Sequence, residues 1–135
     1  MEKSTPTVII ESDDESVIQM FRQASSLKGY KVLVEHEKLQ AIWDTLDNIV
    51  VCFVIDLDVL GTESMAFINI IKKMRPRLPV VILSSEENQS STKIMAEFGV
   101  FYRGIKPLCV QEVEHILEGV DSHLMRNRDY LSVSL

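Results

Sequence analysis

Two kinds of hydrophobic pattern alternate along the chain. Short apolar runs, which are typical of β-strands, fall at residues 7–11, 31–35, 49–55, 80–85 and 100–106. Between and after them, apolar residues recur every three or four positions, as on one face of an α-helix, at residues 17–27, 39–46, 65–74, 88–98 and 113–124. The second helical segment carries Leu39, Ile42, Trp43 and Leu46, and we expect this stripe to face the core.

The regular alternation of strands and helices predicts an α/β fold. The third and fourth strands are continuously apolar, as expected for strands of a parallel sheet that is covered on both faces. Right-handed connections between such strands give an open, doubly wound sheet, here with five parallel strands and five helices. In sheets of this kind, ligands bind outside the carboxyl ends of the strands.

Composition and charge exclude several classes of function. The chain has 135 residues, which suits one domain, and its net charge of −6 argues against direct binding of nucleic acid. The longest apolar run is far shorter than the ~20 residues that span a bilayer, and the start MEKSTPT is not a signal peptide, so we expect no membrane association. Cys52 and Cys109 form no metal-binding motif, and a reducing cytoplasm is the expected environment.

Polar residues follow the predicted strands and should meet at one edge of the sheet. The first strand leads into ESDDE at residues 11–15, the third into Asp56, the fourth into Ser84 and Ser85, and the fifth into Lys106. Two or three carboxylates can hold a hard divalent cation such as Mg²⁺. The cation and the lysine together would neutralise a phosphoryl group on its way to the central carboxylate. This set of groups indicates a carboxylate nucleophile that forms an aspartyl-phosphate.

Four motifs at these strand ends, VIIESDDES, FVIDLDVLG, PVVILSS and GIKPL, are similar to those of a known family. In these four motifs, and in the order of its predicted strands and helices up to about residue 124, the chain resembles the receiver domains of two-component response regulators. The resemblance implies a flavodoxin-like domain with strand order 2-1-3-4-5 that accepts a phosphoryl group from a sensor histidine kinase or phosphotransfer protein, with Mg²⁺ as cofactor. Its output would be altered contacts at the fourth helix and fifth strand with a downstream protein or a fused output domain.

The resemblance also implies roles for individual residues. Asp56 matches the phosphoacceptor, Lys106 the lysine that pairs with the phosphate, and Ser84 the switch hydroxyl. Asp58 matches the position whose backbone carbonyl binds the metal, alongside the carboxylates of Asp13 and Asp56. A cis peptide bond is expected between Lys106 and the proline that follows it.

Three positions depart from the family pattern. The family usually has two adjacent acids after the first strand, whereas the matching positions here are Ser12 and Asp13. A register shifted by one residue would make the pair Asp13–Asp14, and in the first register Asp14 is a further candidate ligand. Leu60 stands where many members have proline. The switch aromatic of the fifth strand falls at Arg103, whose charge cannot be buried without a partner.

These departures leave two interpretations within one fold. A phosphorylatable receiver would use Asp56, Asp13, Ser84 and Lys106, whereas a pseudo-receiver would keep the fold for protein contacts and rarely carry phosphate. The Asp56–Asp58 pair is also similar to the nucleophile motif of haloacid-dehalogenase-type phosphatases, in which the second aspartate is the general acid. In those enzymes the metal-binding acids follow the nucleophile strand, whereas here the acidic cluster precedes it. A signalling module is therefore favoured over an enzyme.

We expect one receiver domain over residues 1–125, with residues 126–135 as a C-terminal tail or linker stub. The last helical stripe ends before the sequence RNRDYLSVSL. The last helix carries acidic residues at positions 112, 114 and 118 and does not match the basic dimer face of transcription-factor receivers. Binding to DNA would therefore require a separate output domain.

Overall fold

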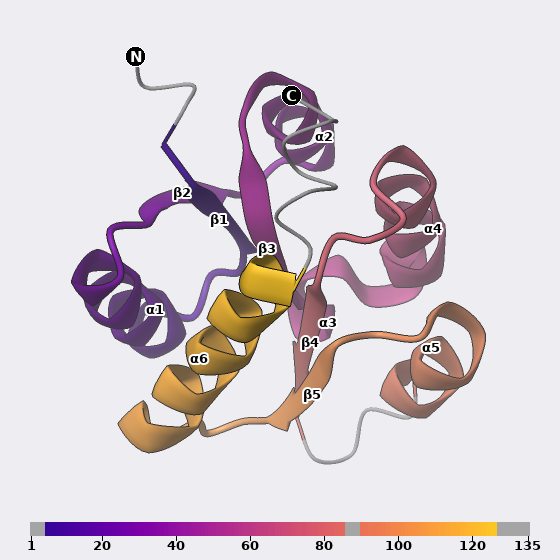
Figure 1. The fold of residues 1–135 in the computed structure, drawn as a ribbon. Coiled ribbons are helices and arrows are strands. Elements are labelled where there is room, and N and C mark those ends of the chain that lie inside the picture. Colours follow the sequence, from indigo (N-terminus) through magenta and orange to yellow (C-terminus); the bar gives the residue numbers. More distant parts are fainter. Residues whose placement is uncertain (1–4, 86–89, 127–135) are drawn as a thin grey trace.

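Five parallel strands form a single sheet in the order β2-β1-β3-β4-β5 (Figure 1). The computed structural model describes residues 5–85 and 90–126. The strands are β1 (Thr7–Glu11), β2 (Lys31–Glu35), β3 (Val50–Asp56), β4 (Val80–Ser84) and β5 (Tyr102–Ile105). The predicted doubly wound, flavodoxin-like α/β fold is confirmed.

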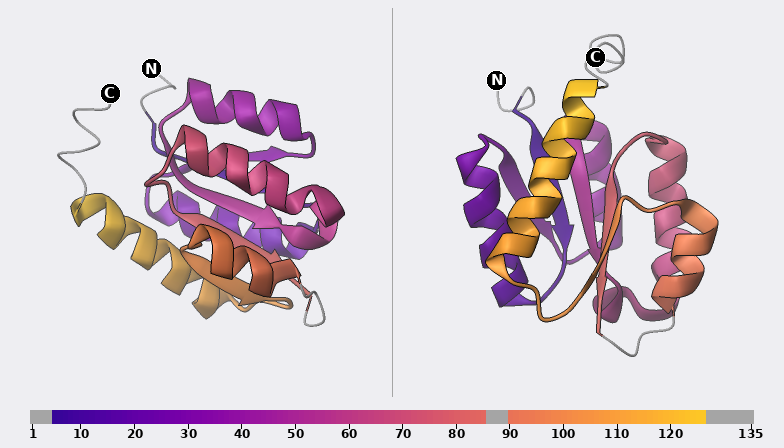
Figure 2. Two further views of the ribbon diagram at one scale, coloured as in Figure 1. Left: turned by 90° about the vertical axis from the view of Figure 1, so that its right-hand side faces the viewer. Right: turned by 60° about the horizontal axis from the view of Figure 1, so that its bottom comes forward.

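In the described part of the chain, five helices of nine residues or more cover the two faces of this sheet (Figures 1 and 2). One face carries α1 (Glu15–Leu27) and α6 (Val110–Arg126), and the other carries α2 (Lys38–Asp47), α4 (Ser64–Met74) and α5 (Ser90–Phe98). Two short turns, α3 (Leu57–Leu60) and the 3-10 helix η2 (Gly61–Glu63), connect β3 to α4. The predicted start of the fourth helix, at residue 88, lies outside the described residues.

Alternation of side chains along the strands divides the core into two clusters, one on each face of the sheet. Ile10 of β1 packs with Phe21 of α1 in the cluster beneath α1 and α6. Ile9 and Phe53 belong to the opposite cluster, beneath α2, α4 and α5. Because β3 is buried along its whole length, it delivers its last residue, Asp56, to the carboxyl edge of the sheet without exposing it.

The outer face of α2 differs from the sequence-based prediction. Leu39, Trp43 and Leu46 are 80%, 63% and 55% exposed, so their predicted place in the core is wrong. The buried residues of α2 are Ala41, Asp44 and Thr45. Of the predicted stripe, Ile42 alone is partly buried and packs against the core cluster, so the prediction holds for Ile42. A stripe spaced every three or four residues predicts a helix, but the spacing does not determine which side of the helix meets the sheet.

Of the predicted C-terminal tail, residues 126–135, the structure describes only residue 126. Residue 126 ends α6, and residues 127–135 lie outside the described residues, so the domain boundary at residue 125 stays a prediction. Within residues 5–85 and 90–126, no helix has both the length and the hydrophobicity needed to cross a bilayer.

Candidate functional site

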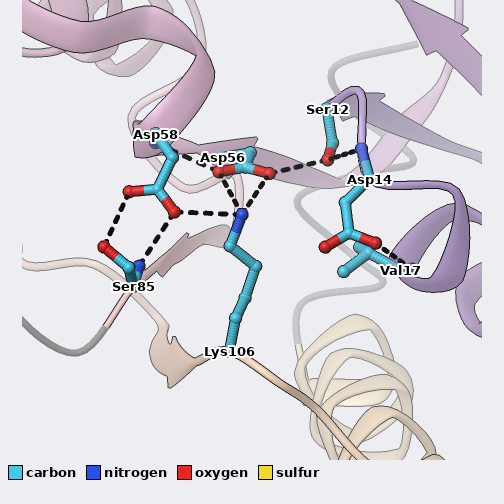
Figure 3. A network of polar contacts seen from close by, with 7 residues as sticks. All are labelled: Ser12, Asp14, Val17, Asp56, Asp58, Ser85 and Lys106. Carbon is cyan, nitrogen blue, oxygen red and sulfur yellow. Dashed lines mark hydrogen bonds and ion pairs between the residues drawn. The ribbon is translucent and has the colours of Figure 1, made fainter.

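The carboxylate of Asp56 is fully buried at the end of β3 and has partners on both oxygens (Figure 3). The Lys106 ammonium lies 3.1 Å from Oδ1 and 2.9 Å from Oδ2. The Ser12 hydroxyl donates to Oδ2 at 2.8 Å, and the backbone N–H of Asp58 donates to Oδ1 at 3.1 Å. Donors from three separate loops therefore converge on one carboxylate, which allows it to stay ionised away from water.

Lys106 reaches this carboxylate from the loop after β5. Its backbone N–H donates to the carbonyl of Ser84 at 2.9 Å, which continues the pairing of β4 with β5 for one residue beyond the strand. Its ammonium also lies 3.0 Å from Oδ2 of Asp58. Burial opposes the charged form of the amine, but the hydrogen bonds and charges of Asp56 and Asp58 outweigh it, so the pKa of Lys106 is raised. The Lys106–Pro107 peptide bond is cis, as the resemblance implied.

The side chain of Asp58 connects two loops at this edge. Its Oδ2 accepts from the backbone N–H of Ser85 at 2.9 Å, and its Oδ1 accepts from the Ser85 hydroxyl at 3.2 Å (Figure 3). The sequence predicted a backbone carbonyl of Asp58 as a metal ligand and, in the phosphatase alternative, its carboxyl as a general acid, but it did not predict this contact with Ser85. The only signal in the sequence was the position of Ser85, directly after a strand that ends beside β3.

The hydroxyl of Ser84 has no hydrogen-bond partner among the described residues. Ser84 is fully buried and follows Leu83, which lies opposite Asp56 in the register of β3 and β4. A buried hydroxyl without a partner is costly, so a group that can accept its hydrogen bond is favoured here. The switch role of Ser84 stays a prediction.

The two acids that follow Ser12 point to other partners. Asp13 is exposed, and its Oδ1 lies 2.7 Å from Nδ1 of His36 in the loop after β2. Asp14 caps α1 by accepting a hydrogen bond from the backbone N–H of Val17 at 3.2 Å. Asp14, the second acid of the pair in the alternative register, therefore caps the N-terminus of α1.

Several solved structures have the same arrangement of elements over nearly their whole length. The receiver domain protein of Methanospirillum hungatei JF-1, described as CheY-like, is 15% identical with a TM-score of 0.73, over 91% of this chain and 98% of that chain. A response regulator from Thermotoga maritima is 19% identical with a TM-score of 0.75, over 87% and 98%. The chain has the receiver fold. Neither the family models nor the curated proteins contain a match.

The receiver fold also occurs as one part of longer proteins. NtrX from Brucella abortus, solved in complex with ADP, is 17% identical with a TM-score of 0.75, and the match covers 94% of this chain but only 29% of NtrX. Because these identities are low, the similarity establishes the fold, and the function must be argued from the residues at the carboxyl edge.

As arranged here, the acids at this edge of the receiver fold do not fit a Mg²⁺ ion. Within residues 5–85 and 90–126, no three Asp, Glu, His or Cys side chains are grouped as ligands of one metal ion. The carboxylate of Asp13 is turned to His36, and Lys106 lies against the oxygens of Asp56 and Asp58 where a cation would be held. The metal-binding roles of Asp13, Asp14, Asp56 and Asp58 therefore stay predictions.

The fifth strand of the receiver fold carries the predicted switch residue, Arg103. Its side chain is exposed on β5, which agrees with the cost of burying an unpaired guanidinium. The neighbouring Tyr102 packs against the cluster beneath α1 and α6, and its hydroxyl donates to Glu112 at 2.7 Å. The switch role of Arg103 stays a prediction.

Proposed function

We propose that this chain is a receiver that accepts a phosphoryl group on Asp56 from a sensor histidine kinase or a phosphotransfer protein. The observation that carries the proposal is the contact of the Lys106 ammonium with both oxygens of the buried Asp56 carboxylate. A lysine held this way is positioned to pair with the oxygens of an incoming phosphoryl group.

In the proposed reaction, one oxygen of Asp56 forms a bond to phosphorus while the bond from phosphorus to the donor's histidine nitrogen breaks. The donor nitrogen leaves with the electron pair of that bond and takes a proton from solvent. Lys106 then pairs with the oxygens of the transferred group, and the unpartnered Ser84 hydroxyl donates to one of them. Asp56 and Ser84 end their strands and Lys106 follows β5, so all three lie at the carboxyl edge of the sheet, where ligands bind in this class of fold.

The proposed output is a changed protein surface, not a released product. Ser84 lies at the end of β4, directly before the segment that leads to α5, and Arg103 lies exposed on the neighbouring β5. A hydrogen bond from Ser84 to a new phosphoryl oxygen would pull on this segment. We therefore place the contacts with a downstream protein or a fused output domain at the α5 and β5 face, and we propose a signalling module, not an enzyme.

The pseudo-receiver is the second candidate, and a specific observation favours it. Ser12 and Lys106 already satisfy the Asp56 carboxylate, and Asp13 is held by His36. A carboxylate whose charge is stabilised by this many hydrogen bonds is a poorer nucleophile. The fold would then serve protein contacts without phosphate.

Labelling with acetyl phosphate distinguishes the two candidates. The chain is incubated with acetyl phosphate, with and without millimolar Mg²⁺, and intact-mass spectra are recorded. We expect one phosphoryl group on the wild type and none on Asp56→Asn, with Glu114→Gln, which neutralises an exposed acid of α6, as the matched control that is labelled like the wild type. Absence of any adduct in both conditions would establish the pseudo-receiver. Turnover of p-nitrophenyl phosphate that is lost in Asp58→Ala would instead support the phosphatase alternative.

A further inference from the structure

Three large apolar side chains lie exposed on the outer side of α2. Leu39, Trp43 and Leu46 follow one another at helical spacing, so they are neighbours on the surface of the helix, and each is more than half exposed. Single exposed apolar residues are common, but neighbouring ones that form a patch with a polar rim mark a contact surface. We call these three residues the α2 patch.

A hollow with acidic walls adjoins the α2 patch. It encloses about 400 Å³ and is lined by Glu35, His36, Glu37, Leu39 and Gln40. This volume lies within the range of ligand-binding pockets. Because Leu39 belongs both to the patch and to the wall of the hollow, the two form one continuous surface, which is apolar along α2 and acidic at the start of the helix.

Two further acids lie beside Glu35, which lines the hollow. Glu11 is opposite Glu35 in the register of β1 and β2, and Asp44 approaches Glu35 from α2. Both carboxylate oxygens of Glu11, and Oδ2 of Asp44, have no hydrogen-bond partner among the described residues. Burial, a hydrogen bond to Asp44 and the charges of Asp44 and Glu11 raise the pKa of Glu35 to about 7. A cation brought to Glu35 would favour its charged form and offset this repulsion.

The cations whose charges act on these acids are engaged with other groups. Lys38 and His36 are the two that lower the pKa of Glu11. Lys38 forms an ion pair with Glu63, and Nδ1 of His36 lies 2.7 Å from Oδ1 of Asp13. The acids around the hollow can therefore accept a further positive charge from outside the domain.

Charge also indicates what covers the α2 patch. Apart from Lys38, the charged residues of α2 are Asp44 and Asp47, and the residue before the helix is Glu37. The net charge of the whole chain is −6. A second copy of the chain would bring the same charges to the contact and be repelled, whereas a basic partner would be attracted. Complementarity of charge therefore favours a basic partner over self-association.

We propose that the α2 patch and the acidic hollow together are a docking surface for an amphipathic helix of a partner protein that carries lysine or arginine beside its apolar face. The apolar face of this helix packs along the α2 patch, and a basic side chain reaches the hollow and pairs with Glu35 and Glu37. The surface is separate from the α5 and β5 face proposed for the output, because α4 packs against both α2 and α5 and lies between them (Figure 1). The inference therefore does not depend on phosphorylation of Asp56.

The single tryptophan of the chain, Trp43, reports on this surface directly. The probe is a synthetic amphipathic helix of leucine and lysine, titrated into the full chain without acetyl phosphate. We expect the emission of Trp43 to move to shorter wavelength and its quenching by acrylamide to fall, because the peptide covers a side chain that is 63% exposed. A peptide with glutamate in place of each lysine should bind at least about tenfold more weakly, because it meets acids of like charge.

Two variants test the apolar and the acidic parts of the surface. Leu39→Ala should weaken binding of the lysine peptide about tenfold, because it removes most of an apolar side chain from the contact. Leu27→Ala is the matched control, since Leu27 is 83% exposed at the end of α1, on the other face of the sheet, and its replacement should leave the affinity unchanged. Glu37 makes no side-chain cap of α2, so Glu37→Gln tests its charge alone. This variant should bind about two- to fivefold more weakly at low salt and lose less at high salt, whereas Glu114→Gln on α6 should bind like the wild type.

Three results would overturn the inference: no binding of the lysine peptide, equal binding of the lysine and glutamate peptides, or a loss in Leu27→Ala as large as that in Leu39→Ala. A change in the emission of Trp43 when the chain is concentrated without peptide would identify a second copy of the chain as the occupant and would reject the basic partner. Labelling of Asp56 by acetyl phosphate is read separately, so failure of the docking surface leaves the proposed function in place.

Discussion

Two carboxylates are buried at the ends of neighbouring strands, and their surroundings are opposite. Asp56 ends β3 and receives hydrogen bonds from an ammonium, a hydroxyl and a backbone N–H. Glu11 ends β1, lies opposite Ile55 of β3, and is 1% exposed, yet neither of its carboxylate oxygens has a hydrogen-bond partner among the described residues. Burial alone therefore does not distinguish the proposed phosphoacceptor from Glu11, whereas the set of donors does.

The difference follows from the direction in which each side chain points. Ile9, two residues before Glu11, packs in the cluster beneath α2 and α4, so alternation along β1 turns Glu11 to the same face. Glu35 of β2 lies opposite Glu11 in the register and adds a second acid rather than a cation. Burial raises the pKa of Glu11 to about 7, and burial together with a hydrogen bond to Asp44 raises the pKa of Glu35 to about 7. Burial therefore penalises charge on Glu11, whereas donors surround the Asp56 carboxylate.

Replacement of Lys106 should leave Asp56, like Glu11, buried without a hydrogen bond from a cation. We expect the largest loss of stability from this change. Lys106→Met leaves a fully buried carboxylate without its cation. Breaking a buried ion pair by removing one partner costs about 3–5 kcal/mol, so the free energy of unfolding at pH 7 should fall by about that amount. Urea unfolding followed by circular dichroism measures it.

The double variant Lys106→Met with Asp56→Asn is the decisive control for this prediction. It removes both charges and should recover most of the lost stability, because no uncompensated carboxylate remains. Lys73→Met removes an exposed lysine and should change stability by less than about 0.5 kcal/mol. If the double variant were as unstable as Lys106→Met, the ion pair would not be the reason for the loss.

The pH dependence of stability should reveal the penalty on Glu11. Its folded pKa, about 7, lies above its ordinary value of 4.5, so the folded state binds the proton more tightly than the unfolded state between these values. Stability should therefore be lost as pH rises from about 4.5 to about 7, by as much as about 3 kcal/mol for this shift. In Glu11→Gln this contribution is absent, so its stability relative to the wild type should be greater at pH 8 than at pH 5 by about 2–3 kcal/mol.

Urea unfolding at pH 5 and pH 8 provides the comparison, with Glu114→Gln on the exposed face of α6 as the matched control. A difference between wild type and Glu11→Gln that does not change with pH would show that Glu11 is ionised at little cost, and the contrast with Asp56 would disappear.

The sequence predicted the site residues that lie at the carboxyl ends of the strands. Asp56 and Lys106 were located because a parallel sheet brings the ends of its strands to one edge, and the structure places them in contact. The position of the Asp13 side chain was not predictable, because a partner 23 residues away, His36, determines it. Hydrophobic spacing alone did not reveal that Trp43 lies outside the core, since α2 turns Ala41, Asp44 and Thr45 inward instead.

The smallest expected effect concerns Ser12, which supplies a donor to Asp56 that Glu11 lacks. Ser12→Ala removes one hydrogen bond to a buried carboxylate that keeps Lys106 and a backbone N–H, so we expect a loss of about 1 kcal/mol at pH 7. Ser25→Ala is the matched control, because Ser25 is equally buried and its hydroxyl has no partner among the described residues, and its removal should be neutral or slightly stabilising. In Asp56→Asn, the cost of Ser12→Ala should shrink, because the acceptor no longer carries a charge. Equal costs in both backgrounds would mean that Ser12 stabilises the loop through the N–H of Asp14, which it also accepts, and not the charge on Asp56.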